Sequence, residues 1–480
     1  MADQQLLLLL DGLDEVKEER RADCIQALNQ FLQDYGQTEM VVCSRLQEYE
    51  LLARSNSLQL QAAICIRPLT SEQVDLYLQK AGDQLTALKG LLHTDETLRA
   101  LACSPLMLSV MSLAYQHKAL EEIPHPGSVE EHRRHVFDTY IQQAFRRRGG
   151  EGRQYSEAKT IHWLVKLAQR MSPDSQTIFL IERMQPAWLP TDRQIFWYRL
   201  GTVLASGLIG GLVFGLTGGL SGGLSCSPNG RLSWHWGDGL QWGVVLGLVG
   251  AIAGLLVMCV EKGDIELIET FEISWPALTR SLIRKHTLSR SLTGAMIGAV
   301  GAGLCTWLTN ASLQDGVVFG LTWGGVFGLV LGISAGMTGS AIETRVEPNQ
   351  GIWRSALNAG WVGFIFGLTI ALLAQLGFML MDLHSNCKWL AELLIMLGFG
   401  GLGMLVNEAG KACIQHFTLR VALFAQGIIP WNYARFLDCA VADIFLQRAS
   451  GAYFFIHRTL MEHFAQSSQG SSSFKAPKTI

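Results

Sequence analysis

The hydrophobic positions along the chain fall into three regimes. Up to about residue 195 and again after about residue 407, apolar and charged residues alternate in short runs, as in water-exposed domains. Between these limits charge nearly vanishes, and apolar windows recur that are close to the ~20 residues a transmembrane helix needs. The windows are 198–224, 239–259, 292–308, 317–341, 355–381 and 389–406. Because backbone groups in lipid need internal partners, the pattern predicts about six transmembrane helices.

Lysine and arginine are distributed unequally over the loops between these windows. The 260–291 loop holds Lys262, Arg280, Arg284, Lys285 and Arg290, and the 342–354 loop holds Arg345 and Arg354. Of the three alternate loops, the first holds only Arg231, the second (309–315) holds no lysine or arginine, and the third holds only Lys388. The positive-inside rule therefore places 260–291 in the cytosol, and with six spans both chain termini are expected there too.

Glycines inside the windows recur every four residues. One row is Gly207, Gly211, Gly215, Gly219 and Gly223, and another is Gly316, Gly320, Gly324, Gly328, Gly332 and Gly336. Four residues is close to one helical turn, so each row forms a groove that a neighbouring helix can approach closely. Such a groove serves tight packing, or it forms a pore or a sliding, oligomerising surface. The scarcity of ionisable residues in the windows disfavours a proton-coupled transporter.

The N-terminal pattern predicts a β–α–β unit. Residues 6–10 are five leucines, typical of a strand buried on both faces of a parallel sheet, and Asp11, Asp14 and Glu15 follow at its carboxyl end. An amphipathic helix over 17–35 leads to a second strand over 39–45 that ends in Arg45. In P-loop NTPases an aspartate at this point binds Mg²⁺, and a nearby acid polarises the attacking water. In this chain Arg45 lies where it could sense a γ-phosphate.

Helical segments and a mixed tail follow. Thr70 or Ser71 is the expected N-cap of a helix, and further helices are predicted over 129–148 and 157–171. Residues 430–465 predict a helix, a short strand, a turn, a second strand and a helix, which suits a winged-helix domain. The first part of that domain is expected near 157–190, so the membrane helices would be inserted into it.

Leu-Leu-Asp-Gly-Leu-Asp-Glu followed by Val-Val-Cys-Ser-Arg resembles the Walker B and sensor 1 motifs of NACHT-type NTPases, which belong to the STAND class of signalling switches. Ser-Pro-Leu-Met-Leu at 104–108 resembles the proline segment of that family's first helical domain, and Tyr-Phe-Phe-Ile-His-Arg at 453–458 resembles the close of its winged-helix domain. It implies ATP or GTP with Mg²⁺ as cofactors. The implied roles are metal binding by Asp11, catalysis by Asp14 and Glu15, and nucleotide contact by Arg45, Pro105 and His457.

The resemblance implies a multidomain fold with a truncated α/β P-loop NTPase core and with helical and winged-helix segments. The apolar windows add an all-α polytopic membrane domain, which the resemblance does not cover. The phosphate-binding loop of the family is missing, because the nearest match, Gly410-Lys411, is followed by Ala412 instead of Ser or Thr. We therefore expect an N-terminally truncated fragment, a mis-assigned start, or a protein in which the NTPase has been lost, with little or no hydrolysis by the chain as it stands. The expected domains are 1–66 (NTPase core), 67–150 (helical), 151–196 and 407–466 (winged helix), 197–406 (membrane) and 467–480 (disordered tail).

Charge and cysteine usage narrow the function further. The net charge of −3 argues against a nucleic-acid binder. The sequence contains no Cys-x-x-Cys pair, so its cysteines do not indicate a zinc site or a redox site. The resemblance implies a nucleotide-dependent signalling switch in a bacterial inner membrane, with the lipid bilayer, a homo-oligomer and an unidentified trigger as partners. The alternatives are a glycine-rich channel or transporter with regulatory cytosolic ends, and a gene remnant without function.

Overall fold

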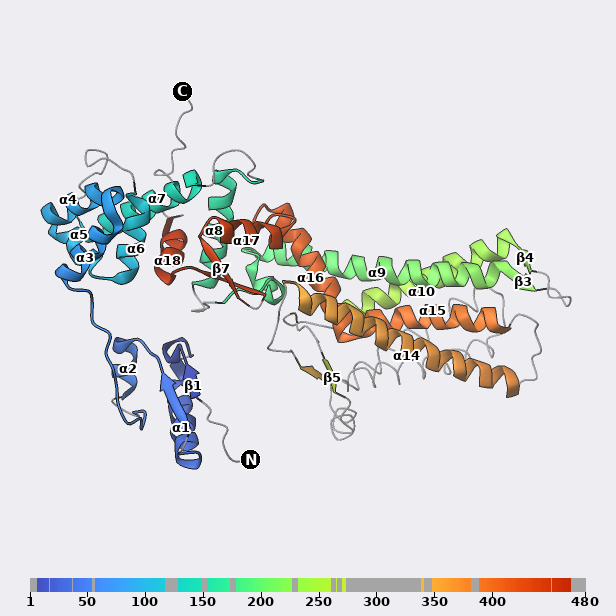
Figure 1. Cartoon of the computed structure of the whole chain (residues 1–480). Helices are drawn as coiled ribbons and strands as arrows, with labels where there is room; N and C mark the ends of the chain where they lie inside the picture. Colours follow the sequence, from blue (N-terminus) through green and yellow to red (C-terminus); the bar gives the residue numbers. More distant parts are fainter. Residues whose placement is uncertain are drawn as a thin grey trace, which may run out of the picture. The chain divides into compact units, whose positions relative to one another are not determined.

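A computed structural model gives the fold of most of the chain (Figure 1). It describes residues 7–16, 18–36, 38–53, 57–116, 128–147, 154–172, 178–226, 232–259, 265, 270–272, 338–340, 348–380, 388–449 and 451–467. The predicted windows 292–308 and 317–341, most of the 260–291 loop, residues 342–347, the glycine row from Gly316 to Gly336 and the tail from residue 468 lie outside these residues. Two short strands in these regions are described, β5 (Thr270–Glu272) and β6 (Thr338–Ser340).

The chain divides into two compact units, and the described part is mostly helical. We call the first the terminal unit; it comprises Met1–Ile178, Cys439–Gln447 and Phe454–Ile480. The second, the central unit, comprises Phe179–Asp438 and Arg448–Tyr453.

The predicted β–α–β unit opens the terminal unit. Strands β1 (Leu7–Leu10) and β2 (Glu39–Val42) pair in parallel, and α1 (Glu18–Asp34) connects them. The expected burial of β1 on both faces is wrong, because the described sheet has only these two strands and Leu9 remains 70% exposed. Helix α1 covers part of the sheet with the fully buried Ile25. A short helix α2 (Leu46–Ala53) follows β2.

A helical bundle makes up most of the rest of the terminal unit. Thr70 is the N-cap of its first helix, because its hydroxyl accepts from Gln73 N while the Gln73 side chain accepts from Thr70 N. The core includes methionines and aliphatic residues of α6, such as Met111 and Leu108, and aromatic and aliphatic residues of α7, such as Phe137 and Ile141, and these two helices pack against each other. The helices are α3 (Ser71–Ala81), α4 (Thr86–Thr94), α5 (Glu96–Ala102), α6 (Pro105–Ala114), α7 (Val129–Arg147) and α8 (Glu157–Met171).

The chain's tail forms the elements that the sequence predicts. They are α17 (Tyr433–Ala442), β7 (Leu446–Ala449), β8 (Ala452–Phe455) and α18 (Arg458–Gln466), in that order. Within the terminal unit α18 packs against α8 with the buried Leu460 and Phe464, and Phe445 packs edge-on against both Phe145 and Phe464. The tail therefore shares a core with residues that precede the membrane helices.

Segments from both sides of the membrane helices also meet in the central unit. Phe179 and Tyr453 exchange two backbone hydrogen bonds of 2.7 and 2.8 Å, as neighbouring antiparallel strands do. The Glu182 carboxylate is buried and accepts a hydrogen bond from Gly351 N, so it satisfies a free N–H group in the first turn of the following long helix. Residues 179–182 thus connect the tail and the start of the second helical hairpin.

Four long helices coincide with four of the predicted windows. They are α9 (Asp192–Gly223), α10 (Trp236–Cys259), α14 (Gln350–Leu380) and α15 (Lys388–Val406). In the described part, three stretches are long and apolar enough to cross a membrane: Asp192–Gly223, Trp236–Leu255 and Gln350–Leu372. The number rises to five if each of two bent helix pairs is one span, and one of these pairs is α15 with α16 (Glu408–Ala425).

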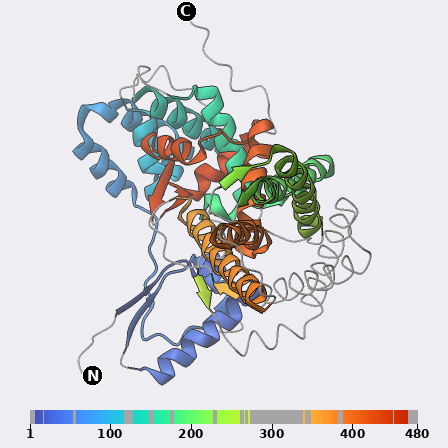
Figure 2. The same cartoon turned by 90° about the vertical axis from the view of Figure 1, so that its right-hand side faces the viewer.

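Glycines hold these helices together as two antiparallel hairpins (Figure 2). A β-carbon on Gly211 would lie 3.2 Å from the carbonyl oxygen of Gly247, and one on Gly215 would lie 3.2 Å from that of Gly243. The two-stranded β3 (Leu224–Cys226) and β4 (Leu232–Trp234) close this α9–α10 hairpin. Gly363 and Gly400 bring α14 and α15 together in the same way. The predicted role of the glycine row in close packing is confirmed for α9.

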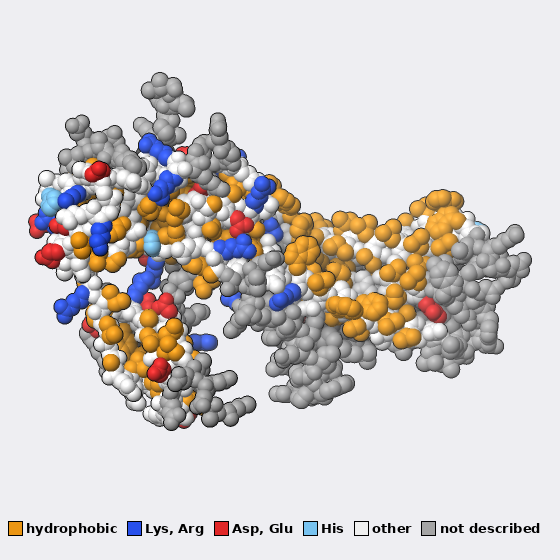
Figure 3. All heavy atoms as spheres, in the orientation of Figure 1, with side chains coloured by type: hydrophobic (Ala, Val, Ile, Leu, Met, Phe, Trp, Pro, Cys, Tyr) orange, Lys and Arg blue, Asp and Glu red, His pale blue; other side chains and the backbone are white. Residues whose placement is uncertain are grey.

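The outer faces of these helices are apolar. Hydrophobic side chains cover the surface over α9, α14 and α15, where Figure 3 shows few charged groups. The exposed residues of α9 include five leucines four positions apart, on a different side of the helix from the glycine row: Leu204, Leu208, Leu212, Leu216 and Leu220. Such a surface is costly in water and stable in lipid.

Candidate functional site

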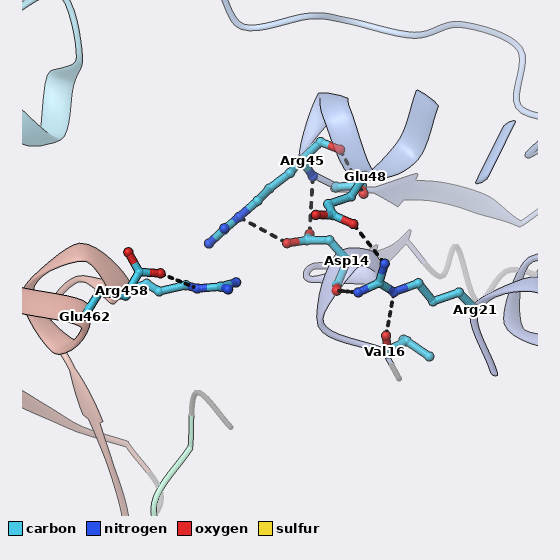
Figure 4. A network of polar contacts seen from close by, with 8 residues as sticks. Asp14, Val16, Arg21, Arg45, Glu48, Arg458 and Glu462 are labelled. Carbon is cyan, nitrogen blue, oxygen red and sulfur yellow. Dashed lines mark hydrogen bonds and ion pairs between the residues drawn. The ribbon is translucent and has the colours of Figure 1, made fainter. Parts of the chain in front are cut away.

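The ends of the two parallel strands bring Asp14 and Arg45 together (Figure 4). Gly12 turns the chain after β1 with a φ of 82°, a left-handed conformation that favours glycine, and a short 3-10 turn over Leu13–Glu15 carries Asp14. The strand pairing continues past β1 and β2, because Cys43 N donates to Leu10 O and Leu13 N donates to Cys43 O. These bonds align the two loops, so the residues after each strand face each other.

The Asp14–Arg45 pair has a defined geometry. Arg45 Nε lies 3.2 Å from Asp14 Oδ2, and Arg45 N donates to Asp14 Oδ1 over 3.2 Å. The Asp14 side chain is only 8% exposed, whereas that of Arg45 is 53% exposed. The guanidinium group therefore neutralises a buried carboxylate and still presents N–H groups to solvent, where an anionic ligand can reach them.

Arg21 fixes the loop that carries Asp14. Its guanidinium donates to the backbone carbonyls of Asp14 (2.7 Å) and Val16 (2.6 Å) and to the Glu48 carboxylate (2.9 Å). Sequence reasoning missed Arg21 and Glu48. The available signal was the position of Arg21 in the second turn of α1, because a cation near a helix N-terminus is unfavourable unless a tertiary contact compensates for it.

The other two acids of this segment stand apart from the pair. Asp11 lies exposed directly after β1, and its carboxylate has no hydrogen-bond partner among the described residues. Glu15 ends the 3-10 turn, and only its backbone belongs to the described part. The described residues contain no group of three or more His, Cys, Asp or Glu side chains that could hold a metal ion. Mg²⁺ at Asp11 would need phosphate oxygens and water as its remaining ligands.

Pro105 and His457 lie in other parts of the terminal unit. Pro105 is the exposed first residue of α6. His457 is the N-cap residue of α18, makes no side-chain cap bond there, and has a pKa lowered by partial burial. No contact found among the described residues links either one to Asp14 or Arg45.

Two histidine–carboxylate pairs on α7 were not predicted. His132 Nε2 lies 2.7 Å from Asp95 Oδ2 and its Nδ1 lies 2.9 Å from Ser128 O, so both ring nitrogens face oxygen atoms. Asp95 is also the N-cap of α5, accepting from Thr97 N and Leu98 N. Burial raises the pKa of Asp95, but the bonds from Leu98 and His132 outweigh it and lower the pKa overall. The second pair joins His463 of α18 to Asp138 over 2.9 Å.

Comparisons with known proteins give no further guide to this arrangement. No family model, no curated protein and no solved structure matches the chain.

Proposed function

We propose that the chain is a membrane-embedded, NACHT-like signalling switch in which the state of a bound nucleotide is coupled to the helical hairpins of the central unit. The observation that carries the proposal is the Asp14–Arg45 pair at the carboxyl ends of two parallel strands. Ligands of parallel α/β sheets bind at this edge, and an arginine that can leave its aspartate for a phosphate group reports whether that phosphate is present.

The proposed cofactor is ATP or GTP with Mg²⁺. Asp11 would ligate the ion through its exposed carboxylate, Asp14 and Glu15 would orient water, and Arg45 would contact the terminal phosphate. Pro105 and His457 would contact the base and a phosphate. The single carboxylate of Asp11 suits a Mg²⁺ ion whose other ligands are phosphate oxygens. The given sequence contains no glycine-rich phosphate-binding loop with its lysine. We therefore expect weak nucleotide binding and little or no hydrolysis by the chain as given.

The coupling would run through a winged-helix domain split by the membrane helices. The packing of α18 on α8 and the Phe179–Tyr453 bridge support this organisation, because both join chain segments on opposite sides of the insertion. A change in the terminal unit can then act on both ends of the inserted helices. The protein would be a multi-pass protein of a bacterial inner membrane with cytosolic termini, active as a homo-oligomer and responsive to a trigger that remains to be identified.

A glycine-rich channel or transporter is the second candidate. Its pore would need polar groups that face a water-filled path. Thr217 instead donates to Val213 O of its own helix, and Gly398 of α15 packs against its hydroxyl. Within the described helices this threonine therefore serves packing, which favours the switch over the channel.

Nucleotide binding tests the proposal. The full chain in nanodiscs is titrated with a fluorescent ATP analogue with and without Mg²⁺, next to Asp11→Ala, Arg45→Ala and the matched control Asp23→Ala, which removes an exposed acid of α1. We expect saturable, Mg²⁺-dependent binding that both site variants lose and the control keeps. Absent binding, or equal binding by Asp11→Ala and the control, would refute the proposal.

A further inference from the structure

We propose that α16 lies in the lipid–water interface as a transverse helix, with Phe417, Val421 and Phe424 inserted between lipid headgroups and acyl chains. The partner of this surface is the phospholipid interface itself. The inference is independent of nucleotide binding and rests on the contacts, exposure and neighbours of this helix in the central unit.

The bend before α16 separates it from the span that precedes it. Helix α15 has 19 residues, which rise about 28 Å at 1.5 Å per residue and so nearly cross a hydrocarbon core of ~30 Å alone. The chain then bends by 66°, and Asn407 begins a new helix by accepting a hydrogen bond of 2.8 Å from Ala409 N. Because α15 alone nearly reaches this thickness, we assign the span to α15 and leave α16 outside it.

The contacts of α16 place it across the starts of two spans. Cys413 Sγ lies 3.7 Å from Ile352 O, and the hydroxyls of Thr418 and Thr202 lie 2.9 Å apart. Ile352 comes two residues before Arg354, the last charged residue of α14, and Thr202 comes three residues after Arg199, the last of α9. The helix therefore runs at the level where both spans change from charged to apolar sequence, which is where the bilayer surface is expected.

The two sides of α16 differ as an interfacial helix requires. Ala412, His416, Leu419 and Leu423 form the buried side, and His416 Nε2 hydrogen-bonds Ile181 O. Phe417, Val421 and Phe424, spaced four and three residues apart, form the exposed side. Trp431 packs edge-on against both phenylalanines, and its carbonyl accepts a hydrogen bond from Arg420. An arginine beside an aromatic cluster suits a phosphate-bearing interface.

The same level carries exposed aromatic residues on the neighbouring helices. Phe196 and Trp197 precede Arg199 on α9, and Trp353 precedes Arg354 on α14. Aromatic side chains collect at membrane–water interfaces, where an apolar ring and a polar edge are both accommodated. Both spans that α16 contacts thus carry exposed aromatic residues where charged sequence gives way to apolar sequence, which favours the lipid interface over a second protein chain as the occupant of its exposed side.

Photolabelling of the unmodified chain tests the proposal. The protein is reconstituted in phosphatidylcholine vesicles with a diazirine either near the glycerol end or at the tip of one acyl chain, and labelled residues are mapped by mass spectrometry. We expect the shallow probe to label Phe417, Val421, Phe424 and Trp431 several-fold more than the deep probe. Leu212 and Leu216 should show the opposite preference, and the buried Leu419 should stay unlabelled.

A paired variant separates insertion of α16 from insertion of the spans. Phe417→Asp/Phe424→Asp should lose shallow labelling at Val421 while Leu212 keeps its deep label, and Phe417→Trp/Phe424→Trp should keep both. Three outcomes on the unmodified chain would overturn the proposal: no lipid label on α16, stronger labelling by the deep probe, or cross-linking of Phe417 and Phe424 to a second copy of the chain.

Discussion

Gly210 and Gly250 lie so close together that a β-carbon on either residue would overlap the carbonyl oxygen of the other. The neighbouring contact of Gly254 with Ser206 O is of the same kind, so backbone meets backbone along one face of the α9–α10 hairpin. Contacts of this closeness rest on dispersion and weak Cα–H···O bonds, which are the available forces between helices in lipid.

Alanine at position 210 tests this packing with the smallest possible change. Because the obstacle is backbone, the helices must separate, and Gly210→Ala should destabilise the hairpin by about 1–3 kcal/mol. Gly201→Ala is the matched control on the same helix, since nothing lies within 4 Å of its added carbon. Thermal unfolding in detergent, followed by size-exclusion chromatography, measures both; equal melting temperatures for the two variants would contradict the close contact.

Arg21 should stabilise the loop of the candidate site. Arg21→Ala removes three hydrogen bonds from a guanidinium that is 17% exposed, and charged hydrogen bonds contribute roughly 1.5–3 kcal/mol each at most. We expect faster amide hydrogen exchange at residues 11–16 and 43–45, whereas Arg20→Ala, on an exposed neighbour, should leave it unchanged. Unaltered exchange in Arg21→Ala would show that the loop holds its shape without this residue.

The lowered pKa of Asp95 predicts that this residue contributes to the free energy of unfolding at neutral pH and loses this contribution in acid. The folded-state pKa of Asp95 is lowered, so its contribution is present above its unfolded value of ~3.9 and is lost as the pH falls through the folded value. Asp95→Asn keeps an N-cap of similar quality but removes the charge that faces His132. At pH 7 the variant should unfold more easily than the parent, and this difference should shrink below about pH 4.

Denaturant titrations at pH 7 and at acid pH measure this difference. Asp95→Ala serves as the comparison, because it loses the cap as well and should cost about 1 kcal/mol more than Asp95→Asn at either pH. A stability difference for Asp95→Asn that does not change with pH would contradict the ion pair.

Ile444 adopts a backbone conformation that is unusual for a β-branched residue. Its φ is 62°, and it follows α17 where Phe445 N donates back to Ala440 O, a helix ending that favours glycine. The left-handed conformation costs roughly 1–2 kcal/mol for a non-glycine residue, so Ile444→Gly should raise the unfolding free energy by about 1 kcal/mol. Calorimetry measures the shift.

The hydrogen bond from Tyr140 to Ile444 O gives this position a second test. The phenol lies 2.7 Å from that carbonyl, and burial raises the pKa of Tyr140 to about 12, so it remains a donor at neutral pH. Tyr140→Phe should cost about 1 kcal/mol both in the parent and in the Ile444→Gly background, because the carbonyl stays in place. A lower unfolding temperature for Ile444→Gly than for the parent would show that the conformation carries no strain.

Elements that depend on local pattern were predictable from the sequence. Hydropathy placed α9, α10, α14 and α15 within a few residues, because a span needs an apolar run of known length. The pattern also placed Asp14 and Arg45 at the carboxyl ends of two parallel strands, because a short β–α–β connection brings these ends to one edge, although their ion pair itself was not predicted.

Features that depend on tertiary contact were not predictable. The five leucines of residues 6–10 suggested a strand buried on both faces, but burial depends on what else covers the sheet, and Leu9 remains exposed. His132 and Asp95 are 37 residues apart in the sequence, and no periodic pattern of residues predicts that they pair. The bend at Asn407 had a signal in the change from apolar to polar sequence, yet its direction follows from the contacts of α16 with α9 and α14.

The central claim, that nucleotide state and membrane helices are coupled, is tested most directly by hydrogen–deuterium exchange of the full chain in nanodiscs. Spectra are compared with and without Mg²⁺ and a non-hydrolysable ATP analogue, with Arg45→Ala as the control for specific binding. The account predicts altered exchange both at residues 11–16 and 43–45 of the terminal unit and at segments 407–431 and 179–191 of the central unit, and no change in the Arg45 variant. Changes confined to the strand ends, or no change at all, would contradict the coupling.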